Sequence, residues 1–363
     1  MDIFFHKRPS KDKIITKTKY LGDYMPLEPL ESAKNTKNIE RIKVAQIGYG
    51  YWGRNVLKAL LSFPHIEVVL FDIEKSQICN IQDNRVTICN NFEEILNDIS
   101  IEAIFIITPP KSHFNLAKSA LLANKHIFVE KPLSTDLAKS QELFELAKKM
   151  QKILHVDHVF LYSSAVNWLK NNINTLGEII YINARRLNLG LFQSDVDVFW
   201  DLGLHDLSII DYLFGLDIKN LNVFSKKLAK YPRSALSSIY FELDNIFVSI
   251  ETSWLSPIKV RKMTFGGSQK TAIYDETKSQ KVTIFDSGVI INTENKQSLY
   301  QKMVQYRNGD ISHPQILQPM PPLNASISDF LHKIKLDISI NLEHENHVLR
   351  VMSALQKISD LAL

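Results

Sequence analysis

Lys131 is the first residue of this sequence whose type and position suit acid-base chemistry. It lies in the segment Glu-Lys-Pro at 130–132, directly after the apolar run 126–129. The proline fixes the turn, so the lysine side chain is expected to leave the end of a buried strand. Partial desolvation there favours the uncharged amine that accepts a proton. By spacing alone, a surface lysine in a turn is an equally good interpretation.

Asp201 and His205, four residues apart, form the second candidate pair. A helix over 201–213 is indicated by apolar residues at helical spacing, and it would place both side chains on one face, one turn apart. An imidazole titrates near neutrality and can shuttle a proton, while a carboxylate can hold a hydroxyl or orient the ring. In isolation, a capping aspartate beside a packed histidine is the alternative. The sequence does not decide whether Lys131 or His205 takes a proton first.

A glycine-rich turn between a strand and a helix could bind phosphate. The run 42–47 is apolar, Gly48, Gly50 and Gly53 follow in the pattern G-x-G-x-x-G, and 55–61 has helical spacing. Gly48 permits a tight turn, Gly50 lets a pyrophosphate approach bare backbone, and Gly53 lets the helix pack close to the strand. The phosphates would then lie at the helix N-terminus.

Asp72 predicts which dinucleotide binds. It stands at the end of a second apolar strand, 67–70, where a carboxylate can accept a hydrogen bond from the ribose 2'-hydroxyl. A 2'-phosphate would be repelled there, and neither Ile73 nor Glu74 offers a cation, although Lys75 could. We therefore expect NAD, with NADP as the less favoured cofactor.

The first half of the chain predicts a parallel, doubly wound α/β sheet. Strands are expected at 86–89, 103–107, 126–129 and 153–160, and helices at 76–81, 91–98 and 111–124. Ligands of such sheets bind at the carboxyl ends of the strands. On that rule the glycine turn, Asp72, the segment 108–110 and the segment 130–132 all face one crevice.

The second half predicts an open, mainly antiparallel sheet with helices on one face. A helix is expected from 163 to 169, and period-two alternation occurs over 179–187, 239–250, 260–265 and 282–284. The domains expected are an N-terminal extension (1–40), a dinucleotide-binding domain (41–160, completed by a C-terminal helix at 341–361) and a substrate and oligomerisation domain (161–340). The extension is expected to be a loose arm or to pack on a neighbouring surface.

Composition excludes several other classes of protein. The net charge of +4 over 363 residues is small and spread out, which gives no support to nucleic-acid binding. No apolar run approaches the roughly 20 residues that a bilayer crossing needs. The two cysteines, Cys79 and Cys89, provide no disulfide framework. A cytoplasmic protein is therefore expected.

Metal binding is not predicted either. His155 and His158 lie three residues apart in an expected strand, so they should point to opposite faces. His344 and His347 lack the glutamate and the spacing of H-E-x-x-H.

Several motifs together resemble those of the Gfo/Idh/MocA oxidoreductases. These are the turn G-Y-G-Y-W-G-R-N, the T-P-P of 108–110 followed by S-H, the segment H-I-F-V-E-K-P, and W-D-L-G-L-H-D at 200–206. The resemblance runs from about 41 to 361. It implies a Rossmann domain plus an α+β domain, with Lys131, Asp201 and His205 in catalysis and substrate binding.

The resemblance also implies a wider set of site residues. Cofactor contacts are expected from Gly48, Gly50, Tyr51, Trp52, Gly53, Asp72, Thr108, Pro109, His113, Glu130 and Lys131. Tyr162 could line the substrate pocket, and Arg185 or Arg186 could clamp a phosphate or carboxylate. The open sheet is expected to pack against the same sheet of a neighbour, giving a dimer or tetramer, with Trp254, Phe241 and Tyr240 as reasonable contacts.

The function implied is NAD-dependent oxidation or reduction of a carbohydrate. The forms G-Y-W-G-x-N and W-D-L-G-x-H-D look most like family members that act on nucleotide-linked sugars, for example at C3 of a UDP-N-acetylhexosamine. A free cyclitol or simple sugar, as in inositol dehydrogenases, is the nearer alternative. A noncatalytic NAD-binding regulator on the same fold is an alternative of another class, and dehalogenation on the same scaffold also stays open.

Overall fold

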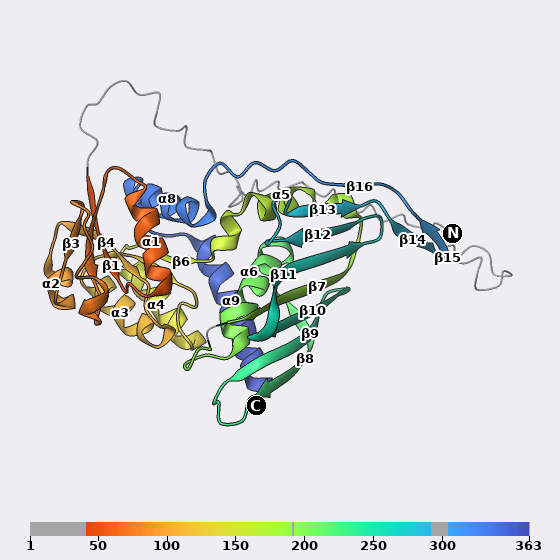
Figure 1. Cartoon of the computed structure of the whole chain (residues 1–363), viewed down its shortest axis with the longest axis horizontal. Coiled ribbons are helices and arrows are strands. Elements are labelled where there is room, and N and C mark those ends of the chain that lie inside the picture. The colour runs from red at the N-terminus through yellow and green to blue at the C-terminus, as the bar shows by residue number, and fades with distance from the viewer. Residues whose placement is uncertain (1–40, 191, 292–303, 363) are drawn as a thin grey trace, which may run out of the picture. The chain divides into compact units, whose positions relative to one another are not determined.

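The computed structural model describes residues 41–190, 192–291 and 304–362. The extension predicted at 1–40 lies outside the described residues. The described part contains a six-stranded parallel sheet, an eight-stranded mixed sheet and a small two-stranded sheet (Figure 1). The predicted fold class, a Rossmann sheet followed by an α+β domain with a mainly antiparallel sheet, is confirmed.

The parallel sheet has the strand order β3-β2-β1-β4-β5-β6, so the order reverses between β1 and β4. Its strands are β1 (Ile42–Ile47), β2 (Ile66–Phe71), β3 (Val86–Ile88), β4 (Ile101–Ile106), β5 (His126–Glu130) and β6 (Leu154–Asp157). Its connections include the helices α1 (Tyr51–Leu61), α2 (Phe92–Asn97), α3 (Pro110–Leu122) and α4 (Leu137–Lys149) and the 3-10 turn η2 (Lys75–Gln77). In sheets of this kind, ligands bind beyond the carboxyl ends of the strands at the point where the strand order reverses, here between β1 and β4.

Local signals account for several of these boundaries. Asn91 caps α2 as expected, because its side chain accepts a hydrogen bond from the backbone N–H of Glu93. The last strand, β6, is shorter than the predicted 153–160, because the 3-10 turn η3 (Val159–Tyr162) follows directly. The helix expected at 76–81 is only the single turn η2.

Helices cover both faces of the parallel sheet. On one face α1 packs beside α8 (Pro322–Lys335), whose Phe330 ring lies 5.5 Å from the ring of Phe105 and 5.6 Å from that of Phe128. On the other face α3 and α4 contribute buried side chains to a core that continues into the second half of the chain. A helix late in the sequence therefore completes the core of the first sheet.

The mixed sheet has the order β16-β13-β12-β11-β7-β10-β9-β8, with β7 and β10 parallel and the other neighbours antiparallel. Its strands are β7 (Ile179–Leu189), β8 (Ile218–Lys227), β9 (Ser234–Leu243), β10 (Ile246–Ser253), β11 (Leu255–Gly267), β12 (Thr271–Asp275), β13 (Val282–Phe285) and β16 (Ile311–Ser312). The hairpin β14 (Gly288–Ile291) and β15 (Val304–Arg307) forms the third sheet.

The helical elements of the second half are α5 (Ser164–Asn172), the 3-10 turn η4 (Ile173–Leu176), the π-helical turn η5 (Phe199–Gly203), α6 (Leu204–Phe214) and α9 (Leu342–Leu361). The expected helix at 201–213 is thus a π-helical turn that continues into an α-helix. The returning C-terminal helix expected at 341–361 is present as α9, and it packs against α4, α6 and β8. The two halves of the described chain therefore share one hydrophobic core.

The alternating run expected over 239–250 is two strands and not one. β9 and β10 form a hairpin whose turn is Asp244 and Asn245, and Asp244 takes the left-handed φ of 51° that aspartate tolerates better than most residues.

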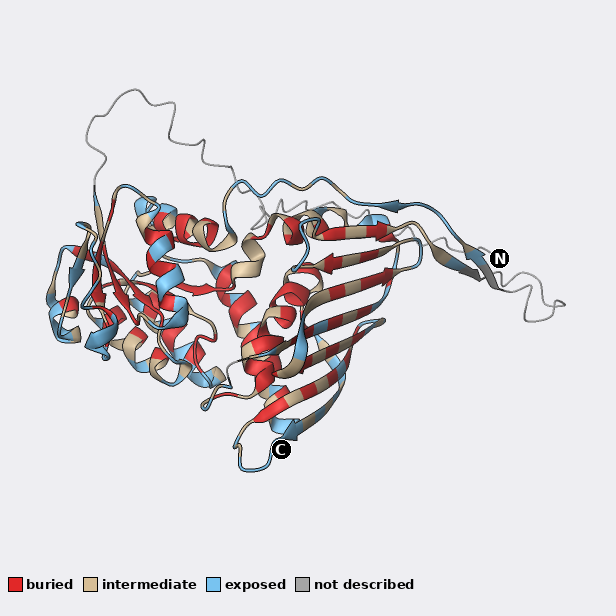
Figure 2. Cartoon of the chain, viewed as in Figure 1, coloured by how far each residue is buried: buried red, intermediate tan, exposed pale blue. Residues whose placement is uncertain are grey.

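One face of the mixed sheet is buried beneath helices and the other is open, which gives its strands the banded pattern of Figure 2. Phe241 and Trp254 are completely buried within their own chain, so the expectation that they contact a neighbouring subunit is wrong. Tyr240 lies on the exposed face, because successive residues of a strand point to opposite sides.

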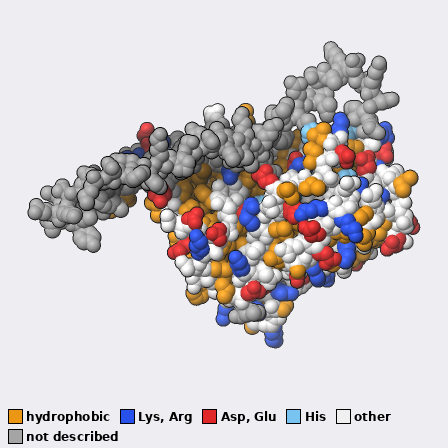
Figure 3. All heavy atoms as spheres, turned by 180° about the vertical axis from the view of Figure 1, so that it is seen from behind, with side chains coloured by type: hydrophobic (Ala, Val, Ile, Leu, Met, Phe, Trp, Pro, Cys, Tyr) orange, Lys and Arg blue, Asp and Glu red, His pale blue; other side chains and the backbone are white. Residues whose placement is uncertain are grey.

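The surface carries mixed charge. On the face shown in Figure 3, Lys and Arg side chains are interspersed with Asp and Glu. None of the helices in the described part of the chain combines the length and the apolar character needed to cross a membrane.

Candidate active site

The glycine turn has the geometry that a dinucleotide phosphate requires. Gly48 has a φ of +99°, and a Cβ there would lie 2.3 Å from the carbonyl oxygen of Ile107. A Cβ on Gly53 would lie 2.4 Å from the carbonyl oxygen of Gly48, so α1 could not start so close to the turn. A Cβ on Gly50 would meet no described atom within 4 Å. Two glycines therefore serve the fold, and the third leaves open space beside the backbone.

The N-terminus of α1 offers its backbone N–H groups to this space. Its first turn has no acidic residue, and no side chain caps it. Gln46 stabilises the turn, because its Nε2 donates to the carbonyl oxygens of Gly48 and Gly53, both at 2.8 Å. Tyr51 is exposed, and the indole N–H of Trp52 donates to Glu130. The turn is thereby linked to the segment that carries Lys131.

Asp72 lies beside the glycine turn, as the sequence predicts. One oxygen of its carboxylate accepts a hydrogen bond from the backbone N–H of Tyr49 at 2.6 Å, and the other accepts from that of Glu74 at 2.7 Å. Each carboxylate oxygen has a second lone pair, so the group can still accept from a ribose hydroxyl. Ile73 next to it is exposed.

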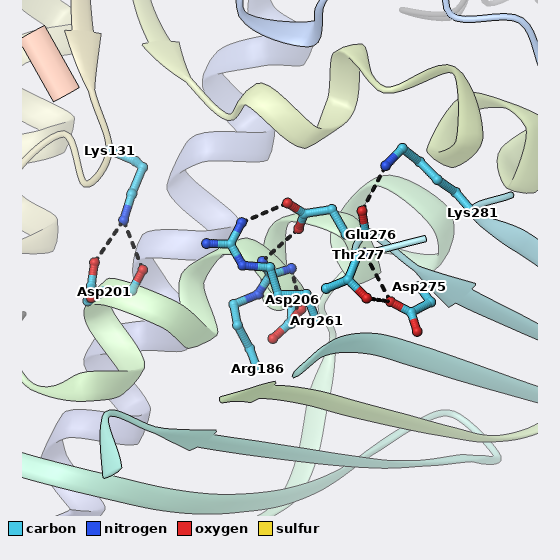
Figure 4. A network of polar contacts seen from close by, with 9 residues as sticks. All are labelled: Lys131, Arg186, Asp201, Asp206, Arg261, Asp275, Glu276, Thr277 and Lys281. Atoms are coloured by element: carbon cyan, nitrogen blue, oxygen red, sulfur yellow. Dashed lines mark hydrogen bonds and ion pairs between the residues drawn. The ribbon is translucent and has the colours of Figure 1, made fainter. Parts of the chain in front are cut away.

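Lys131, directly after β5, and Asp201, in the π-helical turn η5, come together from the two halves of the chain. The Lys131 Nζ donates to the Asp201 carbonyl oxygen at 2.9 Å and to its Oδ1 at 3.1 Å, as Figure 4 shows. Trp254 donates its indole N–H to the other carboxylate oxygen, Oδ2, at 3.0 Å. Asp201 lies in the π-helical turn η5, a rare conformation that is frequent at functional sites. Nothing in the sequence pattern marked Trp254 as the partner of Asp201.

His205 lies in the same region, at the start of α6. Its ring meets that of Phe160 edge to face, with centroids 4.9 Å apart. Burial holds the pKa of His205 well below its ordinary value, and the positive charges of Lys131 and Arg186 act in the same direction. Among the described residues none hydrogen bonds to its ring nitrogens, so a neutral imidazole is left for a ligand.

Arg185 and Arg186 point to opposite faces of β7. Arg186 is buried; its Nε and Nη2 donate to Asp206 at 3.1 and 2.9 Å, and its Nη1 donates to Glu276 at 3.2 Å (Figure 4). Arg185 is exposed and pairs with Glu251 at 2.7 Å. The two do not act as the adjacent cationic clamp that the sequence suggested. Arg186 instead covers the Phe160 ring, with its Cζ 4.7 Å from the ring centroid, and the same Phe160 ring contacts His205.

His113 and Tyr162 are held by neighbouring loops and helices. His113 is completely buried, with Nδ1 2.8 Å from the Pro132 carbonyl oxygen and Nε2 2.7 Å from that of Thr108. It therefore ties the turn at Thr108 and Pro109 to the turn after Lys131. Tyr162 donates its hydroxyl to Asp329 of α8 at 2.6 Å.

Two carboxyl groups lie behind Lys131 at the ends of β5 and β6. Glu130 and Asp157 are partners in the sheet register. Burial raises the pKa of both groups, their proximity raises that of Glu130 further, and the Lys131 ammonium opposes the shift. From the sequence, Glu130 was expected only as a cofactor contact, and Asp157 was not identified.

The four histidines of the two sequence pairs meet in the core. His155 stacks on His344, with ring centroids 4.9 Å apart, and His158 contacts His347. Across the described part of the chain, no group of three or more His, Cys, Asp or Glu side chains is arranged to hold a metal ion.

Comparison with known proteins finds a family model that matches a segment in the first half of the described chain. A Gfo/Idh/MocA model, described as an oxidoreductase family with an NAD-binding Rossmann fold, matches residues 42–158. The uncharacterized oxidoreductase YdgJ of Escherichia coli is 30% identical over 217 residues, which cover 56% of this chain and 61% of YdgJ. Inositol 2-dehydrogenase of Salmonella typhimurium is 23% identical over 199 residues, 50% of this chain and 57% of that enzyme. The matches thus span less than two thirds of these relatives.

The UDP-N-acetylglucosamine 3-dehydrogenase of Acidithiobacillus ferrooxidans matches in both sequence and structure. It is 30% identical over 118 residues, which cover 32% of this chain and 37% of that enzyme. Its solved structure superposes with a TM-score of 0.71 at 19% identity, covering 89% of this chain and 98% of that one. At this identity the superposition establishes a common fold over both halves of the chain.

Proposed function

Residues 42–158 belong to the Gfo/Idh/MocA family of NAD-binding oxidoreductases, and on this premise we propose that the protein transfers a hydride between a nicotinamide cofactor and a secondary alcohol or ketone of a carbohydrate. The observation that carries the proposal is the contact of Lys131 with Asp201 beside His205. It lies at the carboxyl edge of the sheet whose glycine turn can hold a pyrophosphate.

The protein residues would hold the cofactor through backbone groups. The turn at Gly48 to Gly53 and the N-terminus of α1 would bind the pyrophosphate, and the Asp72 carboxylate would accept a hydrogen bond from the ribose hydroxyl. NAD, when bound, supplies the hydride acceptor. The preference for NAD over NADP rests on Asp72 and on the exposed, uncharged Ile73 beside it.

The catalytic roles follow from the contacts of each side chain. Asp201 fixes the Lys131 amine through two hydrogen bonds, and Trp254 fixes Asp201 in turn. The neutral ring of His205 accepts a hydrogen bond from the substrate hydroxyl. His205, or Lys131 in its uncharged amine form, takes the hydroxyl proton as the hydride leaves the carbon. The mutual contact of these groups weighs against a noncatalytic regulator, which would have no need of them.

A nucleotide-linked sugar is the preferred substrate class. The Acidithiobacillus relative, a UDP-N-acetylglucosamine 3-dehydrogenase, supports this choice, and so do the motifs around Gly50 and Asp201. A nucleotide sugar needs cationic groups for its diphosphate, and Arg185 and Arg186 were the candidates. Their ion pairs count against this role, because carboxylates already bind both guanidinium groups. A free cyclitol is the second candidate, favoured by the match to inositol 2-dehydrogenase.

The test is NADH formation by the purified protein with a panel of UDP-sugars and free cyclitols. Lys131→Ala is expected to abolish turnover while NAD still binds. Lys118→Ala is the matched control, because the exposed ion pair of Lys118 with Glu142 and its contact with the Phe114 ring contribute little. Equal turnover by Lys131→Ala and the wild type would refute the catalytic assignment. A panel of ketosugars with NADH tests the opposite direction.

We also propose that the protein works in the cytoplasm as a homo-oligomer. The apolar face of the mixed sheet supports association, since it exposes Phe224, Tyr240 and Phe247 side by side.

A further inference from the structure

A chain of hydrogen bonds runs from the core beside the candidate site to the surface. Nδ1 of His158 lies 2.7 Å from Nε2 of His347, and Nδ1 of His347 lies 2.6 Å from Oδ2 of Asp211. Arg350 donates to both Asp211 oxygens, at 2.6 and 2.8 Å. The two histidines and Asp211 are buried, whereas the Arg350 side chain is 46% exposed. His158 directly follows β6, Asp211 lies on α6, and His347 and Arg350 lie on α9, so the chain spans both halves of the molecule.

These contacts determine where each proton lies. Burial alone would raise the pKa of Asp211, but the hydrogen bonds from His347 and Arg350 hold it below the ordinary value, so the group is a carboxylate. A carboxylate only accepts, and therefore Nδ1 of His347 donates to it. When the His347 ring carries no second proton, its Nε2 is the acceptor, and Nδ1 of His158 donates to it. Ser208 lies 3.3 Å from both of these nitrogens.

The remaining nitrogen of His158, Nε2, is left with a lone pair. Within the described residues no group hydrogen bonds to it. His158 follows Asp157 at the carboxyl end of β6, and it is near enough to Lys131 and His205 for their charges to interact. The charged and titratable groups around the ring are Lys131, His155, His205 and His347.

The neighbouring histidine pair is connected differently, because His155 and His344 stack on each other and His155 reaches the buried Asp157 through Ser326. His344, one turn earlier on α9, accepts the backbone N–H of Val156 with its Nε2 at 3.0 Å, and His155 contacts Ser326 at 3.0 Å. The hydrogen bond of His344 is therefore to a backbone group, whereas His347 bonds to a carboxylate that is paired with a half-exposed arginine. Packing alone does not require that difference.

We propose that His158, His347 and Asp211 form a proton relay for the candidate site. The idea rests on the proposed alcohol oxidation, in which the C–H bond breaks with its electron pair going to nicotinamide and the O–H proton goes to Lys131 or His205. That proton passes to Nε2 of His158, directly or through one water. The Nδ1 proton of His158 moves to Nε2 of His347, and the resulting His347 imidazolium is stabilised by the Asp211 carboxylate, which stays ionised between His347 and Arg350. Reduction runs the same steps backwards.

The first experiment reads the protons directly and needs no substrate. Nitrogen-15 NMR of histidine-labelled wild-type protein is expected to show His347 and His158 as neutral rings protonated at Nδ1. Assignment uses the loss of one signal in each of His347→Gln and His158→Gln. A ring of either residue protonated at Nε2 alone would overturn the relay, whatever the activity of the protein.

The second experiment tests the use of the relay in turnover. His347→Gln and Asp211→Asn are expected to lower kcat by about tenfold to a hundredfold, less than the roughly 10²–10⁴ of a direct general base. KM should not change, and the solvent deuterium isotope effect on kcat should increase. His344→Gln is the matched control, buried on the same helix, and should keep kcat within about twofold.

If His344→Gln lowered kcat as much as the two relay variants do, the chain of hydrogen bonds would have only a structural role. The same conclusion would follow if the solvent isotope effect were unchanged in both relay variants. Urea unfolding of each variant shows whether it folds, and Asp211→Asn serves if His347→Gln does not. Absence of turnover in the wild type with every sugar would refute the proposed function, and the NMR result would still decide the position of the protons.

Discussion

At the scale of single residues, Asp201 is the point where the candidate site is built. It contacts Lys131 with its carbonyl and one carboxylate oxygen, and Trp254 with the other oxygen. A carboxylate held on both sides keeps the amine at one place, and positional precision of this kind is a large part of catalysis. Under the proposed function, the indole of Trp254, a residue far along the chain, therefore positions Asp201 in the candidate site.

Trp254→Phe tests that support. The change removes the donor to Asp201 and keeps most of the buried ring, so we expect the free energy of unfolding to fall by about 2 kcal/mol and kcat to fall as well. Trp200→Phe is the control, because it removes a comparable indole donor, which bonds to Ser359 at 2.8 Å. Urea unfolding and steady-state kinetics measure both effects. An unchanged kcat in Trp254→Phe would show that Asp201 needs no second partner.

Asp157 predicts a dependence of stability on pH. Its pKa is raised in the folded protein by burial, so folding is favoured by the protonated form. This contribution to stability is complete below the pKa of about 4 that an aspartate has in the unfolded chain. It is lost as the pH rises from there through the folded pKa, at about 1.4 kcal/mol per pH unit between the two pKa values. Asp157→Asn should remove this slope. Urea unfolding of the cofactor-free protein at several pH values measures it, and parallel curves for the two proteins would contradict the raised pKa.

Asp72 with Ile73 predicts cofactor preference. Asp72→Ser with Ile73→Arg removes the charge that repels a 2'-phosphate and adds one that attracts it, and Ser can still accept one of the two backbone N–H groups. We expect the ratio of Kd values to shift toward NADP by about tenfold or more, which corresponds to about 1.4 kcal/mol. Ile73→Arg alone should shift it less. Fluorescence titration measures both cofactors, and an unchanged ratio would remove the argument for NAD.

At the scale of elements, the turn before α1 separates glycines needed for folding from one needed for binding. Gly48→Ala places a Cβ against the Ile107 carbonyl at a φ of +99° and should destabilise the protein by several kcal/mol. Gly50→Ala meets open space and should fold normally but bind NAD weakly. Thermal unfolding and NAD titration of both variants distinguish the roles. Equal NAD affinity in Gly50→Ala and the wild type would move the phosphate away from this turn.

The strand β7 shows how an element decides which residue reaches the site. Ile179 is buried, so simple alternation would place Arg185 on the same face. The pairing with β11 shifts by one residue between Gly266 and Gly267, and Ile182, Ala184 and Arg186 are buried instead. This irregularity arises in the pairing of two strands whose residues lie more than 80 positions apart, so no pattern within β7 alone reveals it.

At the scale of the whole molecule, the mixed sheet has an apolar patch that is exposed in the described part of the chain. The exposed rings of Phe224, Tyr240 and Phe247 adjoin across β8, β9 and β10. Tyr240→Asp with Phe247→Asp should convert an oligomer into monomers in analytical ultracentrifugation. Ile99→Asp is the control, because Ile99 is 96% exposed on the other half of the chain. A wild type that is already monomeric would refute the proposed assembly.

The amino-acid sequence by itself determined the parallel order of the first sheet, the glycine turn and the place of Lys131, because these depend on local patterns of apolar residues, glycine and proline. It also indicated a helical segment from Asp201 to Leu213, though not its π-helical start. The helix α4 was not singled out, although Asp136 is an N-cap signal before it.

Only the tertiary structure decided which side chains meet. The bonds from Trp254 to Asp201, from Trp52 to Glu130 and from His347 to Asp211 join residues 53 to 136 positions apart. Such contacts depend on the packing of separate elements and leave no periodic trace in the sequence. Tertiary packing also engaged Arg186 with Asp206 and Glu276, because a buried guanidinium requires carboxylates to offset its lost hydration.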